Sequence, residues 1–157
     1  MLYGIDFSGQ KISVAKRRMP LAHYYQQSFL DGFVPDILKA GINKIYSYSV
    51  AQYCKPDDLE LFIENQLAIL DKNKPFIIAH LDVPDIDKAV FYYQKMNPDI
   101  TQEMLNGRIK TLFGDGSYWH QMDQFREIAL QHGLACEVSD AHYWKYRSDI
   151  VYKSPGL

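Results

Sequence analysis

The feature that most constrains this fold is the alternation of short apolar segments with longer segments of helical periodicity. Four short segments rich in apolar residues predict strands at residues 2–7, 42–50, 74–83 and 134–140, and the segment at 42–50 is also β-branched and aromatic. Between them, apolar residues recur at three- and four-residue spacing, as in amphipathic helices. Strands separated by such helices favour βαβ units. The sequence therefore predicts an α/β fold: a single three-layer domain over residues 1–157, Rossmann-like, with a mostly parallel sheet and helices on both faces.

Three other segments carry their own predictions. Residues 11–17 alternate apolar and polar side chains, which predicts a second strand, antiparallel to the first and joined to it by a turn at residues 8–10. Residues 21–40 show a helical pattern with a break at Pro35. The tail at residues 141–153 predicts an edge strand.

The segment at residues 74–83 is the clearest buried strand in the chain. Its apolar run places Phe76, Ile77 and Ile78 in the predicted core, because a central parallel strand is covered on both faces. The same run ends in a polar stretch that begins at His80.

Composition excludes several classes of protein. With 47% hydrophobic residues and a net charge of −2, the chain is too apolar for a disordered protein and has no overall basic field to attract nucleic acid or anionic lipid. Its apolar runs are far shorter than a membrane span, so no membrane association is expected. The two cysteines, Cys54 and Cys136, form no CxxC pair, which favours reduced thiols and a cytoplasmic location.

Polar residues gather where the predicted strands end. Ligands bind beyond the carboxyl ends of strands in open parallel sheets, so this edge is the predicted site. The residues that the topology places there are Asp6, Ser8, Gly9, His80, Asp82, Asp85, Glu137, Asp140 and His142.

These residue types are ligands for a divalent metal ion. Asp6, Asp82 and Asp140 are the predicted metal ligands, and Mg²⁺ or Mn²⁺ is the one cofactor that the sequence indicates. Asp6 and Asp82 are also candidate catalytic residues, together with His80 and His142, because imidazole titrates near neutral pH. The alternative is structural: Asp85 and Asp82 would cap the turn that follows the strand, and His80 would be a core histidine.

Candidate cofactor-binding residues are Ser8, Gly9 and Ser117. Ser8 and Gly9 form the turn after the first strand, and Ser117 stands at the start of the next predicted helix, where backbone N–H groups hold anions. No GxxxxGK[ST] or GxGxxG motif is present. Residues 16–18 and 143–147 combine cations with aromatic rings, a pattern that serves either nucleic-acid stacking or a covered sheet edge.

The opening residues "GIDFSGQKISVAK" resemble the first hairpin of RNase H-like and RuvC-like proteins. The resemblance covers about the first fifteen residues and implies that Asp6 binds a catalytic Mg²⁺ ion at the end of the first strand. It implies that Asp82 or Asp85 provides a later carboxylate. The chain has no carboxylate at the end of the strand at 42–50, which departs from that pattern.

Two hypotheses about function follow. The first, which favours an enzyme, is a small metal-dependent hydrolase of phosphoesters, similar to a nuclease or phosphatase, whose partner is a phosphorylated small molecule or nucleic acid. The second is a non-catalytic binding or regulatory module that docks a protein or nucleotide through an aromatic-rich surface. Stabilisation by a divalent metal ion separates them, because a ligand selective for the folded state raises its stability.

Overall fold

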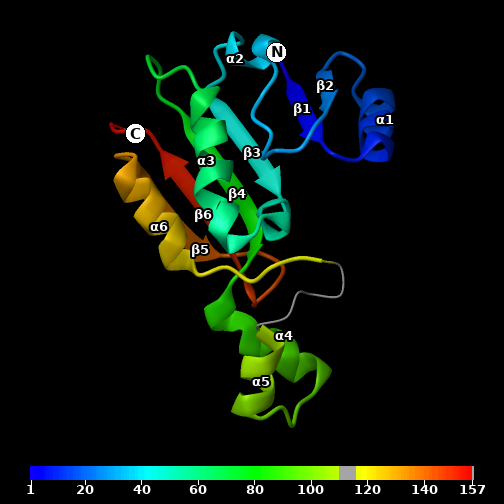
Figure 1. Cartoon of the computed structure of the whole chain (residues 1–157), viewed down its shortest axis with the longest axis vertical. Coiled ribbons are helices and arrows are strands. Elements are labelled where there is room, and N and C mark those ends of the chain that lie inside the picture. Colours follow the sequence, from blue (N-terminus) through cyan, green and yellow to red (C-terminus); the bar gives the residue numbers. More distant parts are fainter. Residues whose placement is uncertain (110–115, 157) are drawn as a thin grey trace. The chain divides into compact units, whose positions relative to one another are not determined.

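The computed structural model describes residues 1–109 and 116–156 (Figure 1). The chain forms two compact units: the first comprises Met1–Ile42 and Leu61–Asp71, and the second comprises Asn43–Glu60 and Lys72–Leu157. Strands and helices alternate along the chain up to Met96, as predicted for an α/β chain. The single domain over residues 1–157 stays a prediction.

The first unit opens with a parallel βαβ arrangement. Strand β1 (Tyr3–Asp6) pairs in parallel with β2 (His23–Gln26), and helix α1 (Gly9–Arg18) connects them. The antiparallel strand predicted at 11–17 is therefore wrong, and so is the hairpin that the RNase H-like resemblance implied. Ser8 decides the local structure: its side chain caps α1 by accepting a hydrogen bond from the Lys11 N–H.

The rest of the first unit contains little regular structure before α3. Helix α2 (Pro35–Leu38) is one turn long and begins at Pro35, where the sequence predicted that a second short helix opens after a break. The helical pattern predicted for residues 21–34 is wrong. Helix α3 (Leu59–Ala68) begins in the second unit and continues into the first, following the 3₁₀ turn η2 (Pro56–Asp58). Asn65 of α3 donates to the backbone carbonyl of Phe29 at 3.1 Å.

The second unit contains a four-stranded mixed sheet with the order β3-β4-β6-β5. Strand β3 (Lys44–Tyr48) is parallel to β4 (Ile77–Pro84), as predicted. Strand β6 (Arg147–Lys153) is antiparallel to both β4 and β5 (Ala135–Asp140). The sheet is therefore mixed rather than mostly parallel, and the tail forms an inner strand rather than an edge.

Burial explains the inner position of β6. Its side chains alternate strictly between half-buried and buried, and Ile150 and Tyr152 are 0% exposed. Helix α6 (Met122–Gln131) packs on β5 and β6, and the Tyr152 hydroxyl donates to the backbone carbonyl of Phe125 at 3.0 Å.

The core prediction for β4 is largely confirmed. Phe76 and Ile78 are buried, whereas Ile77 is half-buried. Along β4, the alternating burial pattern changes to continuous burial at Asp82, Val83 and Pro84, where the strand approaches the polar residues of the candidate site.

After β4 the chain forms a small helical region with an aromatic core. The 3₁₀ turn η3 (Ile86–Lys88) leads into α4 (Ala89–Met96), and α5 (Gln102–Ile109) packs beside α4 (Figure 1). Trp119 is the buried centre of this cluster. None of the helices in the described residues is long and apolar enough to cross a membrane.

Candidate functional site

The first group of candidate residues lies at the C-terminal end of β1. Asp6 closes the strand, and its Oδ1 atom accepts a hydrogen bond from the backbone N–H of Ser8 at 2.8 Å. Its Oδ2 atom lies 3.9 Å from Lys11 Nζ, and the Asp6 side chain is 29% exposed. The sequence placed Asp6, Ser8 and Gly9 at a strand end that binds ligands, and the structure brings these three residues together in one turn.

Gly9 has a local packing role in this turn. A Cβ atom at this position would meet Gln26 Oε1 at 2.9 Å, closer than a side chain tolerates without movement of Gln26. Gln26 in turn donates to the backbone carbonyl of Phe7 at 3.3 Å. Gly9 therefore lets the start of α1 approach the end of β2.

The second group lies at the C-terminal ends of β3 and β4. The Ser49 hydroxyl donates to Asp82 Oδ2, and Arg147 Nη1 lies 3.2 Å from the same oxygen. Arg147 Nη1 also donates to the backbone carbonyl of Asp82 at 2.7 Å and to Gln52 Oε1 at 2.6 Å. Ser49, which follows β3, and Arg147 of β6 thus both contact the Asp82 carboxylate of β4. Gln52 of the 3₁₀ turn η1 (Ala51–Tyr53) holds Arg147 from the other side of this contact.

A third group surrounds Lys88 beside this edge. Lys88 Nζ donates to Asp140 Oδ1 at 2.6 Å and to Ser148 Oγ at 2.8 Å. Ser148 Oγ donates to Asp85 Oδ2 at 2.7 Å, and Asp85 also caps η3 through the Asp87 N–H. The Lys88 ammonium holds the pKa of the Asp140 carboxyl below its usual value by hydrogen bonding. The structural alternative for Asp85, a cap of the turn after β4, is confirmed.

Two histidines occupy the core beside these groups. His80 is 0% exposed, and its Nδ1 atom lies 2.8 Å from Ser47 Oγ. Burial, followed by the charge of the neighbouring His120, lowers the pKa of His80 to about 3. Burial lowers the pKa of His120 to about 4, against the effect of its hydrogen bond to the backbone carbonyl of Ala51. Both rings are therefore neutral core side chains at pH 7.

The remaining predicted residues lie away from these contacts. His142 is exposed and packs edge-on against Tyr143, with ring centroids 4.6 Å apart. Ser117 is buried and precedes α6 by five positions, so it does not stand at a helix N-terminus as predicted. Residues 117–119 have no regular secondary structure, and the chain is held by the Tyr118 N–H, which donates to the Gln52 carbonyl at 2.7 Å, and by a bridge between His120 and Asp85. Gly114 and Asp115, of the predicted turn at 114–117, lie outside the described residues.

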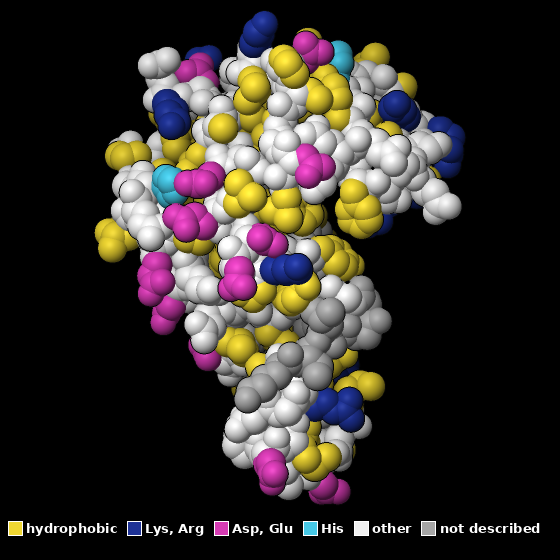
Figure 2. Space-filling view, viewed as in Figure 1, with side chains coloured by type: hydrophobic (Ala, Val, Ile, Leu, Met, Phe, Trp, Pro, Cys, Tyr) yellow, Lys and Arg dark blue, Asp and Glu magenta, His cyan; other side chains and the backbone are white. Residues whose placement is uncertain are grey.

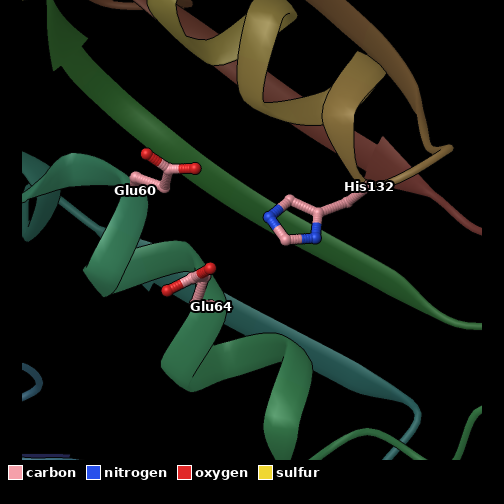
Figure 3. A group of neighbouring side chains, drawn as sticks. All are labelled: Glu60, Glu64 and His132. Atoms are coloured by element: carbon pink, nitrogen blue, oxygen red, sulfur yellow. The ribbon is translucent and has the colours of Figure 1, made fainter.

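Three further ionisable side chains are drawn in Figure 3. Glu60 and Glu64 lie one turn apart on α3, and His132 follows α6. Ligand-type atoms of Glu60 and His132 lie within 4.8 Å of one another, and all three side chains are exposed. Exposed acidic groups of this kind are common without a metal ion, so they receive no functional role. Figure 2 shows acidic, basic and apolar side chains mixed over the face that it presents.

The sequence reasoning missed three residues of the second group: Ser49, Gln52 and Arg147. Ser49 and Gln52 follow a predicted strand, and a search for polar residues at every strand end would have found them. Arg147 has no such signal, because its place depends on the pairing of β6 with β4.

The sequence matches no protein family model and no curated protein. Solved structures with a similar fold include S-adenosylmethionine (SAM)-dependent methyltransferases. Magnesium protoporphyrin IX methyltransferase from Synechocystis PCC 6803, with bound SAH, is 11% identical over 98% of this chain and 63% of its own, with a TM-score of 0.63. The DhpI–SAM–HEP complex is 15% identical over 98% of this chain and 67% of its own, with a TM-score of 0.62.

A third structure is the SAM-dependent methyltransferase SibL in its apo form. It is 11% identical over 98% of this chain and 43% of its own, with a TM-score of 0.64. This chain thus spans 43–67% of the length of these three proteins. The likeness shows that the chain has the α/β fold of SAM-dependent methyltransferases.

This likeness overturns the predicted function. A metal-dependent phosphoester hydrolase is wrong, and so is a divalent metal ion as the cofactor, because the neighbours are methyltransferases with SAM or SAH bound. The alternative, a non-catalytic binding or regulatory module, stays a prediction. The physical reason for the error is that strand-end carboxylates also serve as ion-pair partners: Asp82 contacts Arg147, and Asp140 contacts Lys88.

Proposed function

We propose that this protein is an enzyme that binds SAM and takes part in methyl transfer to a small molecule. The observation that carries the proposal is the Asp6 carboxylate at the end of β1, in a parallel βαβ arrangement of a methyltransferase-like fold. Ligands bind beyond the carboxyl ends of parallel strands, and an acidic residue at such a strand end accepts hydrogen bonds from ribose hydroxyls.

The geometry of Asp6 fits a ribose. A carboxylate has about four lone-pair sites, and Ser8 N–H uses one of them on Oδ1. Lys11 Nζ lies at 3.9 Å from Oδ2, beyond hydrogen-bonding distance, and the carboxylate remains partly exposed. Acceptor capacity for the two vicinal hydroxyls of a ribose is therefore left at this strand end.

SAM supplies an electrophilic methyl group on a sulfonium. In this chain, Asp6 would hold the ribose, while the Ser8 cap and Gly9 keep the turn beside β1 in place. The neighbours extend beyond the length of this chain, so methyl transfer itself belongs to the proposal and not to the likeness of fold.

Several finer predictions remain part of the proposal. A three-layer arrangement with helices on both faces of the sheet, a single domain over 1–157 and a cytoplasmic location stay predictions. The proposed partners are small molecules, namely the cofactor and a methyl acceptor. The phosphorylated molecule or nucleic acid suggested by the sequence stays a prediction.

The test compares the melting temperature with and without S-adenosylhomocysteine (SAH) in wild type, Asp6→Ala and Asp31→Ala. Asp31 is an exposed aspartate of the same unit and serves as the matched control. SAH should raise the melting temperature of wild type and Asp31→Ala, because binding to the folded state stabilises it, and should have little effect on Asp6→Ala. Equal shifts in all three proteins, or no shift in wild type, would refute the role of Asp6.

A further inference from the structure

The ends of β3 and β4 hold the two strained residues of the described chain. Ser49 and Asp82 are the two non-glycine residues there with positive φ, at 52° and 64°. They face one another, because the Ser49 hydroxyl donates to the Asp82 carboxylate. Residues in such sparsely populated conformations cluster at ligand sites, where the surroundings hold them in place.

The strand itself is irregular at this point. The register between β4 and β6 shifts between His80 and Val83, and Asp82 is the residue whose N–H leaves the ladder to bond Asp149 Oδ1 at 2.8 Å. Bulges of this kind re-aim a side chain and are frequent beside active sites. The irregularity therefore sets the direction of the Asp82 side chain.

In the part of the chain that the structure describes, one oxygen of this buried carboxylate has no hydrogen-bond partner. The Asp82 side chain is 8% exposed, and its hydrogen bonds, from Ser49 and Arg147, are both to Oδ2. Among the described residues Oδ1 has no hydrogen-bond donor, and it is not one of the fully buried atoms that lack a partner. Oδ1 therefore keeps some exposure to solvent.

The charges around Oδ1 determine what it can bind. Arg147 balances the charge of Asp82, and its Nη1 atom is already shared among Oδ2, the Asp82 carbonyl and Gln52 Oε1. The Asp82 carboxylate, the largest influence, raises the pKa of the exposed Tyr48 phenol, so this ring stays neutral beside it. A hydrogen-bond donor would meet an acceptor atom that no described residue occupies, whereas an anion would meet the charge of the carboxylate.

We propose that Asp82 Oδ1 binds and orients a hydrogen-bond donor, a hydroxyl or amino group, of a small-molecule ligand at the end of β4. The ligand's part as methyl acceptor rests on the proposed function. Asp82 is then a residue that determines specificity, with Ser49 and Arg147 as positioning residues that fix its carboxylate. This role requires no metal ion at Asp82.

Two probes of equal size test the proposal on the full chain: benzylammonium, a donor, and benzoate, an acceptor. Saturation-transfer NMR should detect binding of benzylammonium at millimolar concentration in preference to benzoate. In ¹⁵N spectra of wild type, benzylammonium should shift the amide signals of Ser49 and Asp82. This wild-type measurement needs no variant, so it decides the question even where a substitution prevents folding.

The variants are Asp82→Asn and the matched control Asp123→Asn, whose carboxylate also pairs with an arginine, Arg126, at 2.6 Å, on an exposed helix face. Asp82→Asn should weaken benzylammonium binding by on the order of tenfold, as expected for loss of a charge-assisted hydrogen bond. Asp123→Asn should bind it as wild type does.

Failure of this proposal is distinguishable from failure of the proposed function. The role of Asp82 would be overturned if benzylammonium did not bind, or if benzoate bound at least as tightly. It would also be overturned if the Ser49 and Asp82 amide signals did not shift, or if Asp82→Asn bound benzylammonium as tightly as wild type does. SAH binding is measured separately through Asp6. Loss of SAH binding alone would overturn the cofactor assignment and leave the donor site standing.

Discussion

The hydroxyl of Ser49 donates a hydrogen bond to the carboxylate of Asp82, 33 residues further along the chain, and both residues have a left-handed backbone. The contact joins the ends of two neighbouring parallel strands, which is where a ligand site is expected in an open α/β sheet. Arg147 completes it from the antiparallel strand β6. The arrangement yields predictions on stability that are independent of any ligand.

The backbone strain at Ser49 predicts a difference between two substitutions. Ser49→Ala removes the hydroxyl and keeps a Cβ in the left-handed region, whereas Ser49→Gly removes both the hydroxyl and the strain. Ser49→Gly should therefore be more stable than Ser49→Ala by about 1 kcal/mol. Urea denaturation of both proteins measures this, and equal free energies of unfolding would show that φ at Ser49 carries no strain.

The ion pair between Asp82 and Arg147 predicts non-additive mutations. The two side chains are 8% and 12% exposed, so Arg147→Met leaves a largely buried carboxylate without its cation. We expect a loss of about 3 kcal/mol in the free energy of unfolding. The double variant Asp82→Asn with Arg147→Met should lose less than the sum of the two single changes, because no unpaired charge remains. Additive losses would argue against the pairing.

The two buried histidines predict a loss of stability in acid. Their pKa values in the folded protein, about 3 for His80 and about 4 for His120, lie below the ordinary value of 6.5. The unfolded chain therefore binds more protons, and the stability present above pH 6.5 is lost as the pH falls toward 4. Between pH 8 and pH 5 the expected loss is on the order of 2 kcal/mol per histidine.

Urea denaturation at pH 8 and pH 5 measures this dependence. Because carboxylates also contribute in acid, the comparison is made with His120→Gln, which should lose less stability over this range than wild type. His142→Gln, at an exposed position, is the matched control and should behave as wild type. The same pH dependence in all three proteins would contradict the buried, neutral state of His120.

The core of β4 predicts a graded response to truncation. Ile78 is 0% exposed, so Ile78→Ala should cost about 2–5 kcal/mol, the transfer free energy of the lost atoms plus the cavity. Ile77 is half-buried on the same strand, so Ile77→Ala should cause a smaller loss in the free energy of unfolding. A loss under about 1 kcal/mol at Ile78 would mean that β4 is not an inner strand.

The elements predicted well are those whose periodicity allows one interpretation. The segments that became β3 and β4 are β-branched and bounded by polar residues, and α3 and α6 have apolar side chains at helical spacing. Residues 11–17 were ambiguous, because Ile12 and Val14 alternate like a strand within what is one helix. The Ser8 cap and the basic last turn of α1 were the better signals.

The sheet order lay beyond local pattern. Whether the tail forms an edge strand or lies between β4 and β5 depends on pairings across the whole unit, and Arg147 reaches Asp82 from 65 positions away. The turn after β1 was recognisable from Asp6, Ser8 and Gly9 as a strand end, and its role as a ligand site stays a prediction. The identity of the ligand could not be predicted, because a carboxylate binds metal ions, ribose hydroxyls and the cationic side chains of lysine and arginine.

Titration calorimetry of the wild-type chain with SAH and with its 2′,3′-dideoxy analogue tests the central claim most directly. We predict one SAH site per chain and a much weaker affinity for the dideoxy analogue, because that analogue lacks the hydroxyls from which Asp6 would accept hydrogen bonds. Heats of SAH injection equal to those into buffer, or equal affinity for the two compounds, would contradict it.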